Sequence, residues 1–395
     1  MPLDLLMLAR YNKERIIVRS RTSLLIKAVL LCMLLTACSM HGDPIDSLFE
    51  RIHQANKAFS EESETPGSQS SQTTADEPLR GVWISYLELS RLAGSAEGVF
   101  HAQAAAMMQR VKEAGGNAVF VQVRPFGDAI YPSSVYPWSK TISGSTGSGL
   151  SYDPLAVLLE QAHAQGLSFH AWINPYRLMN GTDFSKVDNT FRTAAWYNGD
   201  SRSAYMYEVN GIWWLKPSNS EAQALIVDGV RELLSKYALD GIHLDDYFYA
   251  VSPESLGETT ASAKENNTRL IKTLYDLTKE LKPNALFGVS PAGGFRKDST
   301  LPVSDTGALS TDLALWCREA GYLDYVMPQI YWDETHEIQP FTMTLEKWRA
   351  FVTEPSVRLY VGLASYKFDA ATIEKQKQAA LEKADGFCLY RYDYI

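Results

Sequence analysis

Short apolar runs alternate with helix-period segments from residue 80 to the end of the 395-residue chain. Each run has the length of a buried parallel strand, and between the runs apolar residues recur every three or four positions. The predicted strands are 81–86, 118–123, 168–173, 241–245, 286–290, 325–328, 359–362 and 386–390. The predicted helices are 97–114, 154–165, 219–237, 262–281, 307–320, 343–352 and 371–383.

Eight strands that alternate with helices predict an α/β fold, a (β/α)8 TIM barrel over residues 80–395. A doubly wound parallel sheet is the alternative, but no glycine-rich phosphate loop follows the first strand. The carboxyl ends of all the strands of a barrel meet at one face. Polar residues that follow different strands are therefore expected to share one site.

The pattern changes before residue 80. An apolar run at 28–35 follows several basic residues and is too short to span a bilayer, which is typical of an export signal. The segment Leu35-Thr36-Ala37-Cys38 resembles the lipobox of bacterial lipoproteins, whose cysteine is lipidated. We expect a signal peptide at 1–38 and a domain held outside the cytoplasm on a bacterial membrane through a lipid on Cys38. A cleavable signal with a chance cysteine is the alternative.

Residues 39–79 are rich in Ser, Thr, Glu, Gln and Gly, and this composition predicts a flexible linker because it cannot bury enough apolar surface to fold. The formal net charge is −9; residues 1–37 hold six basic and two acidic side chains, a net of +4, so the remainder carries −13. So acidic a domain argues against nucleic acid as its partner. Cys317 and Cys388 are expected to be buried thiols, although a disulfide is an alternative outside the cytoplasm.

The segment 240–249, Asp-Gly-Ile-His-Leu-Asp-Asp-Tyr-Phe-Tyr, carries the densest candidate chemistry. Side chains alternate along a strand, so His243 and Asp245 share one face, and Asp246 begins the following loop. Carboxylates supply the acid, base or nucleophile of glycoside hydrolysis, and aromatic rings stack on sugars. The plainer interpretation is that one of the two acids caps a turn or a helix.

Other strand ends are also polar and aromatic, while the strands themselves are apolar. This asymmetry predicts one shared pocket, although any single residue in it could belong to the core or to an ion pair. The expected substrate-binding residues are Arg124, His170, Trp172, Asn174, Tyr176, Arg177, Tyr247, Gln329, Tyr331, Trp332, Asp333 and Lys367.

Six segments resemble, in order, those of the glycosyl hydrolase-like family 10, a former domain of unknown function: VQVRPFGDAIYPSS, YDPL, HAWINPYR, DGIHLDDYFY, FGVSP and MPQIYW. The resemblance covers about residues 80–395. It implies a (β/α)8 barrel that hydrolyses glycosidic bonds. Some relatives are exported lipoproteins that cut peptidoglycan glycan strands stripped of their stem peptides. Relatives commonly carry a Trp-Arg-Arg-type segment where this chain has 263–269, which lacks tryptophan.

The segment 240–245 is also similar to the fourth-strand motif of the α-amylase family, which implies that Asp245 is the nucleophile or base and that His243 tunes it. Arg124, Arg177 or His243 would keep Asp245 ionised through hydrogen bonds. Asp246 is the first candidate for the general acid, followed by Asp333 and Glu334. Chitinases place their acid where this chain has Tyr247, which disfavours their chemistry.

Two other functions remain open. One is a glycan-binding lipoprotein without catalysis. The other is a metal-dependent polysaccharide hydrolase or deacetylase that uses His243, Asp245 and Asp246. The chain has seven histidines but no His-x-His or His-x-x-x-His pair, so metal-ligand spacing is poor. We therefore expect a polysaccharide substrate, no metal and no cofactor; the oligomeric state stays open.

Overall fold

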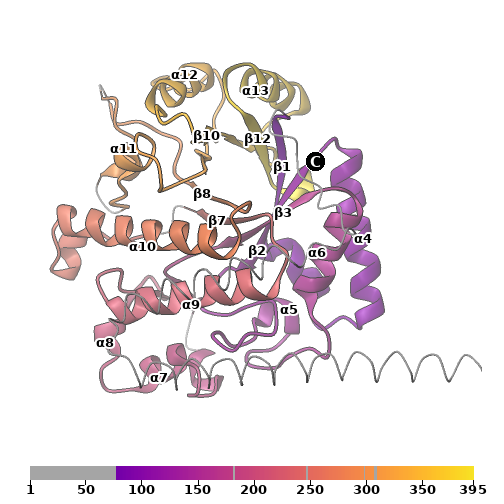
Figure 1. The fold of residues 1–395 in the computed structure, drawn as a ribbon, viewed down its shortest axis with the longest axis vertical. Helices are drawn as coiled ribbons and strands as arrows, with labels where there is room; N and C mark the ends of the chain where they lie inside the picture. The colour runs from indigo at the N-terminus through magenta and orange to yellow at the C-terminus, as the bar shows by residue number, and fades with distance from the viewer. Residues whose placement is uncertain (1–76, 181–182, 246–247, 298, 307–308) are drawn as a thin grey trace, which may run out of the picture. The chain divides into compact units, whose positions relative to one another are not determined.

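The computed structural model describes residues 77–180, 183–245, 248–297, 299–306 and 309–395 (Figure 1). The predicted signal, Cys38 and nearly all of the predicted linker lie outside these ranges, as do Asp246 and Tyr247. In the described part of the chain, no helix is long and apolar enough to cross a membrane.

A parallel sheet forms the centre of the fold. Its order is β10-β9-β8-β7-β3-β2-β1-β12-β11, and every pairing in it is parallel. The strands are β1 (Leu79–Ile84), β2 (Ala118–Arg124), β3 (Ser168–Ile173), β7 (Gly241–Asp245), β8 (Leu286–Ser290), β9 (Tyr325–Val326), β10 (Arg358–Leu359), β11 (Val361–Ala364) and β12 (Gly386–Tyr390).

The sheet closes on itself between β9 and β12. Only Tyr360 separates β10 from β11, and its N–H donates to the carbonyl of Val326 at 2.9 Å. This one stretch pairs with β9 at its start and with β12 at its end. It therefore counts as the seventh of eight barrel strands, and the predicted TIM barrel is confirmed, strand by strand.

Helices surround the barrel (Figure 1). Those that link successive strands are α4 (Glu97–Glu113), α6 (Pro154–Ala164), α9 (Ser220–Lys236), α10 (Thr260–Leu281), α11 (Leu313–Trp316), α12 (Phe341–Phe351) and α13 (Ala370–Lys383). Shorter elements are α3 (Tyr86–Leu89), η1 (Ser90–Leu92), α5 (Lys140–Ser143), η3 (Pro253–Leu256), η4 (Val303–Asp305) and η5 (Tyr392–Tyr394).

One predicted helix, 307–320, is wrong over most of its length. Only α11 is helical among its described residues. Buried Asp305 accepts hydrogen bonds from the hydroxyl of Thr311 and from the backbone N–H groups of Leu313 and Ala314. These bonds satisfy the chain in a compact turn, which competes with a longer helix.

An insertion between β3 and α9 was not predicted. It contains β4 (Arg177–Asn180), η2 (Asp183–Lys186), α7 (Arg192–Asn198), α8 (Arg202–Tyr205), β5 (Met206–Val209) and β6 (Ile212–Leu215). The three strands form a separate antiparallel sheet in the order β4-β6-β5. Asn210 and Gly211 join β5 to β6 with φ of 50° and 80°, so this Asn-Gly pair was a readable hairpin signal.

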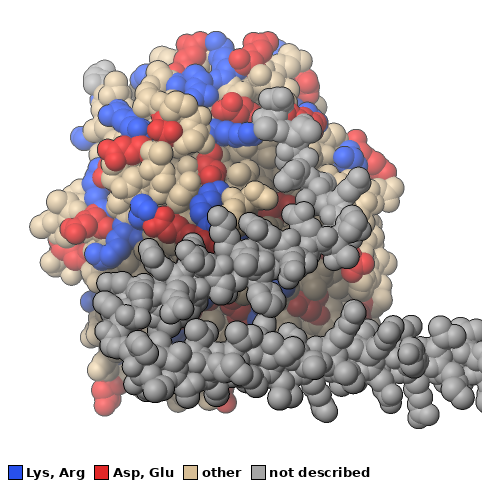
Figure 2. All heavy atoms as spheres, in the orientation of Figure 1, with Lys and Arg blue, Asp and Glu red and all other residues tan. Residues whose placement is uncertain are grey.

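Apolar residues fill two layers. The larger cluster lies between the strands and the helices, and a smaller one, including Trp83, Phe120, Trp172, Tyr325 and Tyr360, fills the barrel interior. Cys317 and Cys388 are buried free thiols, as expected. Figure 2 shows acidic and basic side chains interspersed over the part of the face that is not drawn in grey.

Candidate active site

Asp245 ends β7 at the carboxyl face of the barrel, with only 4% of its surface exposed. Its Oδ2 accepts hydrogen bonds from Trp172 Nε1 at 3.2 Å and from Asn174 Nδ2. Both donors come from β3 and the residue after it, because β3 and β7 are neighbours in the barrel. Two donors on one carboxylate oxygen favour the ionised form of Asp245.

The amide of Asn174 is held in a fixed direction. Gln122 Nε2 donates to Asn174 Oδ1 at 2.6 Å, and Gln122 Oε1 accepts from the backbone N–H of Tyr86 at 3.0 Å. The N–H of Asn174 also donates to the carbonyl of Arg124 at 3.0 Å. These contacts turn the Nδ2 donor of Asn174 toward Asp245, so the carboxylate is positioned by three neighbouring strands.

We expect Asn174→Ala to slow glycan cleavage by about 10- to 100-fold, because Asp245 loses a charge-assisted donor. The acidic limb of the pH–rate profile should move to higher pH, since the lost bond favoured the ionised carboxylate. Asn198→Ala, which changes an exposed asparagine on α7, is the matched control. An unchanged pH profile in Asn174→Ala would show that Asn174 does not stabilise the ionised form of the catalytic carboxylate.

His243 lies one layer below Asp245 and is fully buried. Trp83 Nε1 donates to His243 Nε2 at 3.2 Å, and His243 Nδ1 lies 3.0 Å from the hydroxyl of Tyr325. An indole N–H only donates, so the proton of the neutral ring is on Nδ1 and points to Tyr325. Both ring nitrogens are therefore engaged inside the barrel, and His243 acts below the carboxylate as part of the support.

His170 is deeper still, because it pairs in register with Gly241, four residues before Asp245. The hydroxyl of Tyr325 lies 3.4 Å from His170 Nδ1, and the ring stacks on Phe120. Burial lowers the pKa of His170 to about 4 and holds the pKa of His243 well below its usual value. Both histidines are neutral core residues, so we assign His170 to the support of the site rather than to its surface.

The neutral histidines make a contribution to stability that is lost in acid. Unfolded histidine titrates near 6.5, so the stability contributed by His170 is complete above that pH and is lost as the pH falls toward 4. The loss is on the order of 3 kcal/mol. Buried Asp128 acts in the opposite direction, because burial raises the pKa of its carboxyl to about 6 and a falling pH then favours the folded state.

Denaturant unfolding between pH 7 and pH 4.5 checks this expectation. His170→Asn should be less stable at pH 7 and should show a flatter dependence on pH than the unmodified protein. Asp128 is present in both proteins, so its contribution cancels when the pH dependence of the variant is compared with that of the unmodified protein. His101→Asn on α4 is the control, and equal slopes in all three proteins would exclude His170 as the source.

A β-bulge turns Arg124 away from the barrel interior. The pairing of β2 with β3 shifts between Gln122 and Arg124, so Arg124 leaves the inward face that Gln122 occupies. Its guanidinium lies 4.6 Å from the ring of Tyr136, and Nη1 donates to the carbonyl of Pro175 at 2.9 Å. Arg124 is 1% exposed. It therefore holds the loop after β3 and is not on the substrate side.

The residues after β3 divide between the site and the core. Asn174 reaches Asp245, whereas the buried ring of Tyr176 packs against Phe248, with 6.5 Å between the ring centroids. Arg177 on β4 is half-buried and lies over the ring of Phe126 at 4.6 Å. Tyr176 and Arg177 thus connect the insertion to the barrel.

The segment 263–269, where the resemblance departs from its relatives, is part of α10. Asn266 Nδ2 donates to the hydroxyl of Tyr249 and to Glu258 Oε2, each at 3.3 Å. Tyr249 itself donates to Glu258 Oε2 at 2.7 Å. This contact set fixes the chain a few residues beyond Asp245, so here the segment is a structural clamp.

The ends of β8 and β9 form the next part of the rim. Ser290 lies opposite Asp245 in register, and Gln329 Nε2 donates to its carbonyl at 3.1 Å. Lys367 Nζ donates to the carbonyl of Tyr331 at 2.8 Å. These residues surround the barrel mouth on the side away from β3.

Trp332 leans out of the mouth toward the helices. Gln376 of α13 donates to its carbonyl at 2.9 Å, and its ring packs against the layer between strands and helices. The sequence alone did not show whether the ring of Trp332 faces the barrel mouth or the helix layer.

Asp333 and Glu334 have local structural roles. Asp333 Oδ1 accepts from the backbone and the hydroxyl of Thr335, and these bonds lower the pKa of Asp333. Glu334 Oε1 accepts from the N–H of Thr342 at 2.9 Å, at the start of α12. A general acid must hold a proton, so these contacts favour capping roles and leave Asp246 as the candidate acid.

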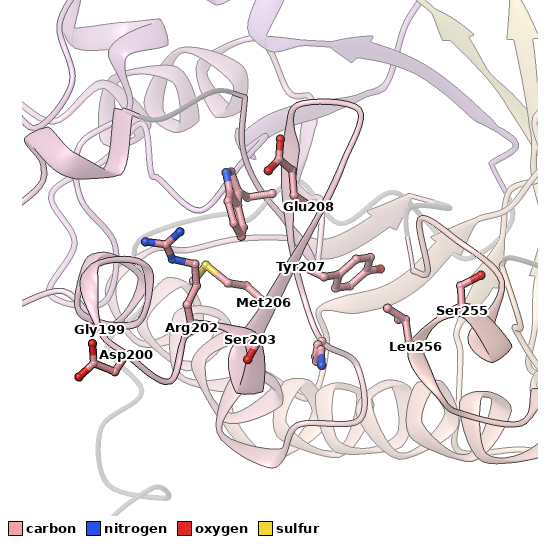
Figure 3. Close-up of a pocket in the computed structure, with 11 residues that line it drawn as sticks. Gly199, Asp200, Arg202, Ser203, Met206, Tyr207, Glu208, Ser255 and Leu256 are labelled. Carbon is pink, nitrogen blue, oxygen red and sulfur yellow. The ribbon is translucent and has the colours of Figure 1, made fainter.

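A hollow of about 600 Å³ opens in the insertion (Figure 3). The ring of Tyr207 points toward Ser255 and Leu256, and the opposite wall carries Arg202, whose guanidinium lies 5.4 Å from the ring centroid of Trp213. The hydroxyl of Tyr207 accepts from the N–H of Ala250 at 3.2 Å, so this wall is tied to the loop that follows Asp245. Sequence reasoning missed the hollow because it missed the hairpin that builds it.

No group of three or more His, Cys, Asp or Glu side chains that could hold a metal ion occurs among the residues the structure describes. Asp246, one of the three ligands considered from the sequence, falls outside them. The chemistry visible at the mouth is a carboxylate that accepts hydrogen bonds from an indole and an amide.

Comparison with known sequences gives consistent matches. A family model described as Glycosyl hydrolase-like 10 matches residues 78–267 and 258–380. Glycosyl hydrolase DigH of Escherichia coli (strain K12) is 32% identical over 430 residues, covering 93% of this chain and 92% of DigH. Glycosyl hydrolase YngK of Bacillus subtilis (strain 168) is 32% identical over 323 residues, covering 75% of this chain and 62% of YngK.

Solved structures share the fold at low sequence identity. The glycoside hydrolase domain of PgaB (BpsB) from Bordetella bronchiseptica superposes with a TM-score of 0.54 at 12% identity, covering 80% of this chain and 95% of that one. The endo-1,4-beta-mannanase of Rhizomucor miehei gives 0.53 at 13% identity, covering 80% and 86%. Both are barrels of glycoside hydrolases.

Proposed function

The chain belongs to the glycosyl hydrolase-like 10 family, and from this premise we propose that it hydrolyses peptidoglycan glycan strands that lack stem peptides. Its relatives are named glycosyl hydrolases, so the chain is a glycan hydrolase. The observation that carries the proposal is the recessed carboxylate of Asp245 at the barrel mouth, held by Trp172 and Asn174.

In the proposed reaction Asp245 is the nucleophile or the base. A second carboxyl, for which Asp246 is our candidate, protonates the oxygen of the leaving sugar as the glycosidic C–O bond breaks. The oxygen of a water molecule ends on the anomeric carbon, and its proton returns to a carboxylate. The two donors to Asp245 support this assignment because both roles require the ionised form.

The recessed position of Asp245 favours a bare glycan chain. Only 4% of Asp245 is exposed, and the indole of Trp172 lies against its carboxylate. A strand with peptides on its sugars needs more clearance to approach that carboxylate than a stripped strand does. The predicted export signal and lipid on Cys38 would keep the domain outside the cytoplasm, where cell-wall glycan is found.

Purified glycan strands with and without stem peptides test the proposal. The full chain in detergent is incubated with each, with and without a chelator, and the products are read by mass spectrometry. Short saccharides from stripped strands alone, with the chelator present or absent, are the expected result. Equal cutting of both substrates would refute the preference for stripped strands; binding without cutting would identify a glycan-binding protein, and chelator sensitivity a metal-dependent enzyme.

A further inference from the structure

A row of tyrosines leads from the barrel interior to the surface. Tyr331 follows β9, Tyr366 follows β11, Tyr390 ends β12, and Tyr394 lies in η5. The rings of Tyr331 and Tyr390 stack with centroids 5.8 Å apart, and Tyr366 packs edge-on against both, at 5.9 Å from Tyr390 and 6.5 Å from Tyr331, so that Tyr331 flanks the path from Tyr390 to Tyr366. Tyr394 continues the row at 6.3 Å from Tyr366. We call these four residues the tyrosine row.

The inner end of the row is continuous with the candidate site. Tyr390 contacts Trp83 edge-on at 6.0 Å, and Trp83 donates to His243 in the layer beneath Asp245. The outer end is open to solvent, because Tyr366 is 46% exposed and Tyr394 is 51% exposed. Large aromatic side chains exposed side by side are uncommon on a soluble domain and indicate a binding surface.

Charged groups hold the row in place. The guanidinium of Arg391 lies 5.8 Å from the ring centroid of Tyr394 and 3.2 Å from buried Glu88. Arg391 also contacts Asp393 at 3.4 Å. The ring of Tyr394 is thus ordered before any ligand arrives, which reduces the entropy cost of binding.

The row and the insertion hollow lie on opposite sides of the mouth. Around the closed barrel the strands follow the order β1, β2, β3, β7, β8, β9, β10 with β11, and β12. The hollow belongs to the chain after β3 and β7, whereas the row follows β9, β11 and β12. Asp245 ends β7, so a sugar chain that is bound at Asp245 and extends across the mouth would contact the tyrosine row.

We propose that the tyrosine row binds successive sugar units of a polysaccharide whose scissile bond lies at Asp245, so that the enzyme cuts within long chains. This inference rests on the proposed function and extends it. The two rings that are open to solvent, Tyr366 and Tyr394, lie 6.3 Å apart between their centroids. Phenol rings offer an apolar face to the C–H groups of a sugar and a hydroxyl to its polar edge.

A sugar chain fits the row better than a membrane or a second protein copy. Lys367, Arg391 and Asp393 lie among the rings, and a membrane-binding face would instead carry aliphatic side chains together with basic ones. Two exposed phenols are also too small a surface for a stable protein interface.

Stripped peptidoglycan strands, separated into tetrasaccharides and long chains, test the proposal. In Tyr366→Ala and Tyr394→Ala, we expect KM for long strands to rise about five- to tenfold each, since ring contacts of this kind contribute roughly that factor. KM for the tetrasaccharide and kcat for both substrates should change less than twofold. Tyr366→Phe should restore most of the affinity, and Leu381→Ala, an exposed apolar residue on α13, should have no effect.

The outcomes separate this proposal from the proposed function. If the unmodified protein cuts neither substrate, the proposed function fails. If it cuts both and the tyrosine variants match it on long strands, the tyrosine row is not a sugar site and the hydrolase assignment stands. Weaker binding of the variants to lipid vesicles, or a change in their oligomeric state, with unchanged cleavage would instead assign the row to a membrane or to a second copy.

Discussion

Asp245→Asn is expected to reduce the turnover of stripped glycan strands by about 10³-fold or more, while binding and stability stay near their original values. Asparagine has nearly the shape of aspartate but can act neither as a nucleophile nor as a base. Asp245 also receives two hydrogen bonds from side chains that remain in the variant. Single-turnover kinetics, strand-binding assays and thermal unfolding of both proteins check the three parts of this expectation.

Asp276→Asn is the matched control, because it removes a carboxylate from α10, outside the barrel, where Lys272 is its partner. It should cut at the unmodified rate. If Asp245→Asn retains more than about a tenth of the activity, Asp245 is not the catalytic carboxylate, and the site has to be sought elsewhere on the mouth.

Gly241→Ala is expected to lower the free energy of unfolding by about 3 kcal/mol. A Cβ at this position would lie 2.2 Å from His170 Nδ1 and 2.8 Å from the carbonyl oxygen of Leu286. The backbone oxygen cannot move without disturbing the pairing of β7 with β8. Equilibrium unfolding in urea measures the change.

Gly98→Ala is the same chemical change at a position where the free energy of unfolding is not expected to fall. Gly98 lies in α4 with no atom within 4 Å of the added Cβ, and alanine favours a helix. Its stability should stay equal or rise by up to about 1 kcal/mol. Equal effects at the two glycines would mean that the barrel interior at His170 is more loosely packed than the structure indicates.

Hydrophobic periodicity was sufficient to predict the barrel. All eight strands are buried on both faces and read as short apolar runs, and six of the seven predicted helices agree closely with observed ones. The seventh failed because Asp305 caps a local turn through contacts that span six to nine residues. The insertion was not predicted although Asn210-Gly211 marks its hairpin, because its short strands do not follow the strand–helix alternation of the barrel.

The site was less predictable than the fold. Strand alternation correctly placed His243 and Asp245 on one inward face. Arg124 was expected beside the substrate because it follows the second predicted strand, but the bulge at Gln122 and Arg124 turns it toward the outer layer. A bulge depends on how two strands pair and leaves little trace in one sequence. The tyrosine row needs the ends of three distant strands, so only the closed barrel brings it together.

Cleavage of stripped glycan strands in water enriched in ¹⁸O tests the central account most directly. A hydrolase that uses Asp245 must place one ¹⁸O at each new reducing end, and mass spectrometry reads it. We expect labelled short saccharides from the unmodified protein and none from Asp245→Asn. Products without the label, or labelled products from both proteins, would contradict the account, because the bond would then be broken without water or without Asp245.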